Sequence, residues 1–336
     1  MARLGSWIEP TPQGLYVPAA DAWIDPSTPQ ARALVTHGHA DHARGGHGAV
    51  LATAETLAIM ECRYGPQNGQ AVAYGETTRI GEVEVKFVPA GHVLGSAQIV
   101  LMHATDSGAE RIVVSGDYKR RPDPTCAPFE PVPCDVFITE ATFGLPVFRH
   151  PDTGSEIDRL LEALHANPER CVLVGAYALG KAQRLIMELR GRNHHAPIYL
   201  HGALQRLCDL YQEMGVDLGP LLPATGRKAA EMKGSIVLCP PGALNDRWSR
   251  RLPDPITAMA SGWMGVRQRA RQRNVELPLV ISDHADWDEL TTTIAELAPS
   301  EVWVTHGREE ALVHWCMTRQ IKARALALAH YEDEDD

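Results

Sequence analysis

The chain has 336 residues, 44% of them hydrophobic, and its 42 acidic and 32 basic side chains give a formal net charge of −10. This length supports a sizeable core, and the absence of a long apolar run or an apolar leader predicts a cytoplasmic protein with no membrane partner. The seven cysteines form no C-x-x-C pair, which argues against a disulfide framework or a cysteine zinc site.

Short runs rich in Val and Ile alternate with helical stretches along the chain. Strands are predicted at Leu34–Thr36, Val83–Val88, Ile99–Met102, Ile112–Val114, Val136–Thr139, Val172–Val174, Ile198–Leu200, Ile236–Leu238, Leu279–Ile281 and Val302–Thr305. Helices are predicted at Ser155–His165, Lys181–Arg190 and Gln205–Met214. This alternation is typical of an α/β protein whose sheets are covered by helices. The final YEDEDD predicts a disordered acidic tail.

Reactive side chains repeatedly follow the end of an apolar run. The segments LVTHGHADH, VPAGH, VVSGD, FITE, VISDH and VWVTHG all have this form. Sites in α/β folds collect at the carboxyl ends of strands, where a rigid sheet holds the loops. We therefore expect these segments to form the rim of a single site.

The strongest motif is HGHADH at His37–His42, which places three imidazoles and one carboxylate within six residues. These side chains are common zinc ligands. His37 and His39 can reach one ion, and Asp41 and His42 can reach a second ion beside it. The alternative is a solvated polar loop, but this spacing is more specific than a pair of histidines.

Three later residues can complete two metal sites. His92 alone would be an ordinary loop histidine, but beside the first motif it is a third ligand for the first ion. Asp117 alone would be a turn residue, but two cations repel each other and a shared carboxylate offsets that repulsion. His306 would complete the second site. We expect two divalent ions, with zinc preferred and manganese as the alternative.

Two further residues suit acid–base chemistry. His284 lies in SDHAD, and Glu140 lies in TEATFG. A carboxylate that orients a histidine and supports its charged form makes that histidine a suitable general acid. For each residue alone, a structural hydrogen bond is the alternative, and the complete set favours a catalytic role.

Basic residues gather locally in this acidic chain. Phosphate contacts are predicted at Lys119, Lys181, Arg247, Arg250, Arg251, Arg267, Arg269, Arg271 and Arg273. Lys119 begins a run with Arg120 and Arg121, and Lys181 lies in the glycine-containing segment 177–183, whose backbone amides could face a phosphate. The alternative is a solvated helix face. Trp248 and Trp263 could stack on bases, with core packing as the alternative.

The motifs THGHADH, PAGHVLGSAQ, SGDYK, TEATFG, SDHAD and VTHG, in this order, resemble the β-CASP branch of the metallo-β-lactamase superfamily, which contains nucleases. Phrases such as VGAYALGKAQR and ASGWMGVRQRARQR resemble the bacterial ligase-associated DNA exonuclease family, and the likeness extends from Gly14 to about Cys316. The resemblance implies an αββα metallo-β-lactamase sandwich at 1–145 and 278–336. An inserted α/β β-CASP domain is expected at 146–277.

The resemblance also implies a role for each motif residue. The first metal is expected on His37, His39, His92 and Asp117, and the second on Asp41, His42, Asp117 and His306. Asp25 matches an aspartate that supports the ligands, with the nearby Asp21 as the alternative. His284 would protonate the leaving oxygen, and Glu140 would orient His284.

The implied function is a two-metal DNA exonuclease that acts on single strands or free ends, in DNA repair with a DNA ligase and a helicase. His306 is typical of RNA-processing members, so an RNA-processing nuclease remains an alternative. A small-molecule metallo-hydrolase would need neither the insertion nor the arginine clusters. An inactive scaffold would be expected to have lost ligands, and none is missing.

Overall fold

The computed structural model describes residues 4–105, 108–272, 275–326 and 328. Arg273 and the acidic tail, both subjects of sequence predictions, lie outside these ranges. The chain divides into two compact units, one made of Met1–Arg149 with His284–Asp336 and the other of His150–Asp283. The second unit is thus an insertion in the first. It begins and ends a few residues later in the chain than the range 146–277 expected from the sequence.

The first unit contains two sheets. One has the order β1 (Glu9–Thr11), β2 (Gly14–Val17), β3 (Ala22–Ile24), β4 (Ala33–Leu34), β5 (Val50–Ala52), β6 (Gly69–Ala71). The other has the order β19 (Lys322–Ala325), β18 (Glu301–Gly307), β11 (Val136–Ala141), β10 (Gly108–Val114), β9 (Ala97–Thr105), β8 (Val83–Pro89), β7 (Thr77–Ile80). In the second sheet, β9 pairs antiparallel with both β8 and β10, while β10, β11 and β18 pair in parallel. The strands β8, β10, β11 and β18 therefore share one direction.

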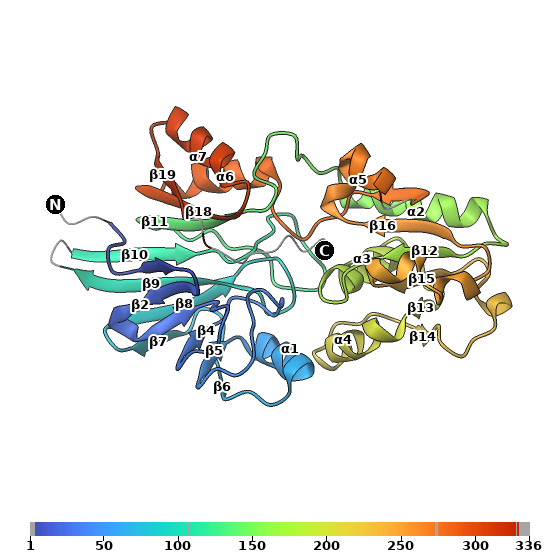
Figure 1. Ribbon diagram of the computed structural model, residues 1–336, viewed down its shortest axis with the longest axis horizontal. Helices are drawn as coiled ribbons and strands as arrows, with labels where there is room; N and C mark the ends of the chain where they lie inside the picture. The colour runs from blue at the N-terminus through green and yellow to red at the C-terminus, as the bar shows by residue number, and fades with distance from the viewer. Residues whose placement is uncertain (1–3, 106–107, 273–274, 327, 329–336) are drawn as a thin grey trace. The chain divides into compact units, whose positions relative to one another are not determined.

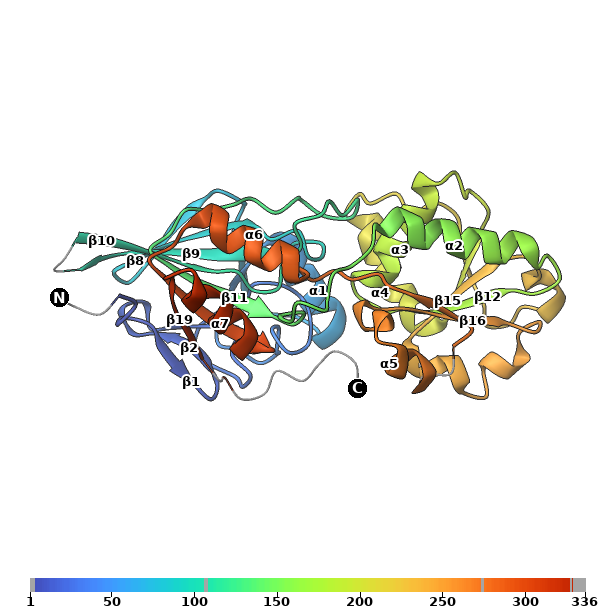
Figure 2. The same cartoon turned by 90° about the horizontal axis from the view of Figure 1, so that it is seen from above.

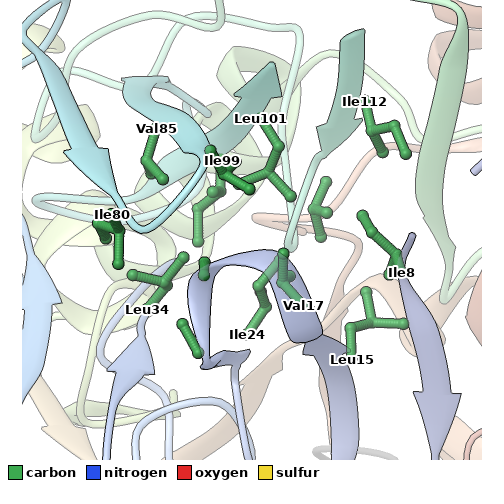
Figure 3. Packing of buried hydrophobic residues seen from close by; sticks show 14 of the residues in the cluster. Ile8, Leu15, Val17, Ile24, Leu34, Ile80, Val85, Ile99, Leu101 and Ile112 are labelled. Atoms are coloured by element: carbon green, nitrogen blue, oxygen red, sulfur yellow. The ribbon is translucent and has the colours of Figure 1, made fainter. Parts of the chain in front are cut away.

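The two sheets pack face to face through an apolar core. Ile24 and Leu34 from the first sheet meet Val85, Ile99 and Ile112 from the second, all of them buried (Figure 3). Alternate residues of a strand point to opposite faces, and each of these strands follows that pattern. The sandwich therefore accounts for the Val- and Ile-rich runs in the sequence.

Helices cover the outer face of each sheet. The helices α6 (Trp287–Leu297) and α7 (Glu309–Thr318) pack on the second sheet, where Leu290 and Leu312 join the cluster of Val113 and Phe137. The helix α1 (Ala54–Tyr64) packs on the first sheet, with Met60 in its cluster. The order of layers is helix, sheet, sheet, helix, as Figure 1 shows. This confirms the α/β class and the αββα sandwich of the metallo-β-lactamase fold.

The second unit is built on a parallel sheet. Its strand order is β14 (Leu221–Pro223), β13 (Ile198–Leu200), β15 (Ile236–Cys239), β12 (Val172–Gly175), β16 (Ile256–Ala260), β17 (Leu277–Leu279). Its helices are α2 (Thr153–Ala166), α3 (Lys181–Gly191), α4 (Gly202–Glu213) and α5 (Arg267–Gln272) (Figure 2). Parallel strands need crossover connections, and most of these helices provide them. Short 3-10 helices occur in both units. The first unit contains η1 (Pro18–Ala20), and the second contains η2 (Ala229–Met232), η3 (Pro241–Asn245), η4 (Ser249–Arg251) and η5 (Gly262–Gly265).

The cysteines and the helices relate to two expectations from the sequence. All seven cysteines are free thiols. Among the described residues, none of the helices has both the length and the apolar character needed to cross a bilayer.

Candidate metal centre

The reactive segments meet at one end of the sandwich of the first unit. His92 follows β8, Asp117 follows β10, and Glu140 and His306 lie at the ends of β11 and β18. Because these four strands run in the same direction, their carboxyl ends lie along one edge of the sheet. The segment His37–His42 follows β4 of the facing sheet.

A first group of possible ligands contains His37, His39, His92 and Asp117, all of them buried. Their ligand atoms lie within 4.8 Å of one another. His39 Nδ1 is 3.1 Å from His37 Nε2 and 3.0 Å from His92 Nε2. Asp117 Oδ2 is 3.4 Å from His37 Nε2 and 3.8 Å from His92 Nε2. All four residues expected at the first metal are therefore together.

A second group contains His42, Asp117 and His306. His42 Nε2 is 3.3 Å from Asp117 Oδ2, and the rings of His42 and His306 stack with centroids 4.9 Å apart. Asp41, the fourth expected ligand, is outside this group, although its Oδ2 lies 3.5 Å from His42 Nε2. The structure thus places Asp41 at the edge of the second site, with its side chain 20% exposed.

The donor spacing of the first group fits a metal ion. With zinc–nitrogen bonds of about 2.0–2.1 Å, the ligand atoms of a tetrahedron lie about 3.3 Å apart. Four of the six separations among the ligand atoms of His37, His39, His92 and Asp117 run from 3.0 to 3.8 Å. Asp117 Oδ1 is buried and has no hydrogen-bond partner within the described ranges. The carboxylate shared by both groups therefore has an acceptor atom that a cation can satisfy.

The charges of the site also favour cations. Burial opposes charge on Asp117, but the neighbouring His42 and His284 outweigh it and hold the pKa of this carboxyl well below its usual value. Burial lowers the pKa of His42, yet Asp117 and Asp41 outweigh burial and raise that pKa well above its ordinary value. Burial lowers the pKa of His306 to about 3. Carboxylates that draw a proton onto a buried histidine will also attract a metal ion, which competes with that proton.

Asp25 supports the ligands from behind. It lies directly after β3, and its Oδ2 is 2.8 Å from His42 Nδ1. Its two oxygens also accept bonds from the amide and hydroxyl of Thr36. Such carboxylate–histidine contacts fix the orientation of a ligating imidazole. The alternative residue, Asp21, accepts a hydrogen bond from the hydroxyl of Tyr16 at the surface, so the geometry selects Asp25.

Glu140 and His284 form a buried pair beside Asp117. Glu140 Oε2 is 3.0 Å from His284 Nδ1, and Glu140 Oε1 accepts a bond from the amide of Tyr118. Burial raises the pKa of Glu140, and the neighbouring His284 opposes that rise. His284 Nδ1 is 4.0 Å from Asp117 Oδ2. The imidazole therefore lies next to the shared carboxylate with one of its nitrogens committed to Glu140.

No family model matches the chain. A probable DNA ligase from Opitutus terrae is 30% identical over 318 residues, which cover 93% of this chain and 30% of that protein. A ribonuclease from Thermus thermophilus is 29% identical over 54% of this chain and 48% of its own length. The endoribonuclease ysh1 of Schizosaccharomyces pombe is 31% identical over 60% of this chain and 30% of its own length. The chain thus spans between 30% and 48% of the length of these relatives.

Two of these relatives are named as nucleases, and each is similar to more than half of this chain. A solved structure of a protein of unknown function from Enterococcus faecalis aligns with a TM-score of 0.54. It covers 87% of this chain and 78% of its own chain at 14% identity. This match concerns the fold alone, and it agrees with the layered architecture described above.

Both lysines that were predicted to contact phosphate, Lys119 and Lys181, are buried. The ammonium of Lys119 is 2.8 Å from Glu289 Oε2, and that of Lys181 is 3.0 Å from Asp283 Oδ1. Each side chain is less than 5% exposed. Each charge is matched by a carboxylate inside the protein, and this burial favours a structural role for both lysines over the predicted contact with phosphate. Lys181 lies in the segment 177–183, which was predicted to face phosphate. It is the first residue of α3, and its side chain pairs with Asp283.

The arginine clusters of the second unit are more open. Arg247, Arg250, Arg251, Arg267 and Arg271 are exposed. Arg269 is half-buried, with its guanidinium 3.9 Å from the ring centre of Trp263. Trp263 is itself buried, which favours core packing over base stacking. Trp248 is half-buried and meets the ring of His201 edge-on.

Sequence reasoning missed the residues that connect the ligands to one another. Thr36 binds Asp25 and contacts His37 Nδ1 at 3.0 Å. Glu289 accepts bonds from the loop that follows Asp117. Asp286 and Glu289 form a capping box at the start of α6. The spacing of an acidic residue and a glutamate three positions later is a recognisable helix-start signal, and it could have located Glu289.

Proposed function

We propose that this chain is a metal-dependent phosphodiesterase that degrades DNA from a free end. The observation that carries the proposal is Asp117, a buried carboxylate that belongs to both ligand groups and also lies beside the Glu140–His284 pair. A shared anion offsets the repulsion between two neighbouring cations, and two neighbouring cations can stabilise the attacking and leaving oxygens of phosphate-ester hydrolysis. Zinc suits the nitrogen-rich first group, and manganese is the alternative.

Two bound cations would supply an activated water and would stabilise the charge that gathers on the phosphoryl oxygens. The protein provides the proton for the leaving oxygen. When Glu140 Oε2 accepts the Nδ1 proton of His284, Nε2 is the nitrogen that can donate a proton from the charged ring. The bond from Tyr118 to Glu140 Oε1 keeps the carboxylate in place during that transfer.

The DNA substrate is supported by one relative in particular. The chain matches part of a probable DNA ligase along 93% of its own length. A nuclease that trims ends before ligation would act on the same polymer as a ligase. On that basis we propose a role in DNA repair in the cytoplasm, with a DNA ligase and a helicase acting on the same ends.

An RNA substrate is the second candidate. The two ribonuclease relatives and the presence of His306 in the second ligand group favour it. Both polymers present the same phosphodiester to the metal centre, so the centre itself does not discriminate between them. The 2′-hydroxyl is the group by which a protein distinguishes RNA from DNA.

Phosphates of either polymer would be contacted by the exposed arginines 247, 250, 251, 267 and 271 of the second unit. Local positive charge is needed because the chain as a whole is at −10. Each neutralised phosphate releases counterions, so binding should weaken as salt rises.

Single-stranded DNA and RNA of one sequence, labelled in turn at the 5′ and 3′ ends, test the proposal. Both are incubated with zinc- or manganese-loaded protein, and a His284→Ala variant serves as the matched control. We expect wild-type protein to shorten DNA progressively from one end and the variant to leave it nearly intact. Cleavage of RNA with DNA untouched would replace the DNA proposal by the RNA one. No cleavage of either polymer would overturn the nuclease proposal.

A further inference from the structure

Lys119 is the starting point, because a lysine whose side chain is only 2% exposed is rare without a specific partner. Its ammonium contacts both a carboxylate and a main-chain oxygen. It pairs with Glu289 Oε2 at 2.8 Å, and it donates to the main-chain oxygen of His284, also at 2.8 Å. The residue two positions after the shared carboxylate therefore contacts the main chain of the proposed general acid.

Glu289 gathers the donors of the same loop. Its Oε1 accepts the amides of Arg120 at 3.0 Å and Arg121 at 2.9 Å. Its Oε2 accepts the amide of Asp286 at 3.1 Å in addition to the ammonium of Lys119. A carboxylate that is 7% exposed and accepts four donors is held in one orientation. The first turn of α6 is thereby fixed to the loop that begins at Asp117.

The loop after Asp117 reaches His284 by two routes. The ring is held by Glu140, which accepts the amide of Tyr118. The main chain is held by the bond from Lys119 to the carbonyl of His284, and by a bond of 2.7 Å from the amide of Ala285 to the carbonyl of Tyr118. The residues next to Asp117 therefore fix both the position and the orientation of the imidazole.

We propose that Lys119, paired with Glu289, is a positioning residue that holds the His284 main chain in register with Asp117. The proposal rests on the proposed function, in which His284 protonates the leaving oxygen. The carbonyl held by Lys119 is bonded to the Cα that carries the imidazole, so a shift of that carbonyl moves the ring. A displacement of about 1 Å at a reacting group can cost about a hundredfold in rate.

The test uses two substrates that differ in their need for an acid. The leaving group of DNA hydrolysis is an alkoxide, which is a poor leaving group and requires a proton. The leaving group of bis(p-nitrophenyl) phosphate is a nitrophenolate, which departs without one. In Lys119→Met we expect kcat on DNA to fall about tenfold to a hundredfold, with KM little changed, while turnover of the nitrophenyl ester stays within about threefold of wild type. Metal content should match wild type.

Glu296→Gln is the matched control. It removes the charge from the 2.6 Å pair between Arg120 and Glu296, which joins the same loop to the same helix without touching His284. We expect this variant to match wild type on both substrates. Amide hydrogen exchange supplies a readout apart from activity. Exchange at residues 284–286 should be faster in Lys119→Met and unchanged in Glu296→Gln.

Equal losses on the two substrates, or wild-type rates in a folded Lys119→Met, would overturn the positioning role. If Lys119→Met does not fold, Lys119→Gln takes its place, because its amide keeps N–H donors without a charge. We then expect kcat on DNA to fall more than turnover of the nitrophenyl ester, with a smaller loss on DNA than in Lys119→Met. Equal losses on the two substrates in Lys119→Gln would overturn the proposal. Failure of the nuclease proposal is distinguishable, since the wild type would then cut neither DNA nor RNA.

Discussion

Asp117→Asn should release metal from both sites while the fold persists. The substitution keeps the size of the side chain and removes its charge, and Asp117 is the one carboxylate in both the group of His37, His39 and His92 and the group of His42 and His306. The first group would then offer three neutral imidazoles to a divalent ion. The second would keep His42 and His306, with Asp41 nearby at 3.5 Å from His42 Nε2. Two cations would face each other without the shared anion between them.

The size of the effect follows from the ligand's position. Loss of a group that merely supports a ligand weakens metal binding by about 10- to 100-fold, so loss of the bridging ligand should cost at least about 100-fold at each site. That factor corresponds to about 2.8 kcal/mol per ion. Protein dialysed against a zinc buffer should therefore hold two ions in wild type and fewer than one in the variant, as counted by mass spectrometry.

Asp123→Asn is the control for this measurement. Asp123 is a buried carboxylate of the same unit that accepts bonds from Thr125 and lies outside the ligand groups. It should retain two ions. An Asp117→Asn protein that keeps both ions at wild-type affinity would refute the bridging role.

Four other outcomes are expected. His284→Ala should lower turnover of DNA about 100- to 10,000-fold with its metal content unchanged, and equal loss of metal would show that His284 is a ligand instead. Chelation should abolish activity, and added zinc or manganese should restore it; activity that survives chelation would exclude the metal mechanism. Replacing Arg267 and Arg271 by Ala should raise KM and make KM less dependent on salt concentration. An unchanged salt dependence would show that these arginines do not contact phosphate. Ile99→Ala, in the core between the sheets, should lower the free energy of unfolding by about 2–5 kcal/mol in urea titrations, and a loss below 1 kcal/mol would contradict the packing described.

The elements that periodicity predicted well are long and bury one face. The predicted strand at Val83–Val88 is β8, Val83–Pro89, and the predicted helix at Lys181–Arg190 is α3, Lys181–Gly191. The strands β1 and β3 were missed because three residues are too few to show alternation. The prediction of a strand at Leu279–Ile281 was wrong beyond its first residue. There β17 ends at Leu279, and the amide of Val280 donates to Glu156 Oε2.

The ligand residues could be predicted from the sequence because histidine and aspartate are common metal ligands, and these residues follow apolar runs that predict strands. The structure brings together six of the seven expected ligands, with Asp41 at the margin. The basic residues were harder, because a lysine reads the same whether it faces solvent or a buried carboxylate. Lys119 and Lys181 each pair with an acid more than a hundred positions away in the chain, and no local pattern reveals such a partner.

Metal-free protein titrated with zinc or manganese, with DNA and RNA hydrolysis followed at each addition, tests the central claim most directly. The shared carboxylate predicts that cleavage of one polymer appears with loading and reaches its plateau at two ions per chain. A plateau at one ion, or no cleavage of either polymer at any loading, would contradict a two-metal nuclease.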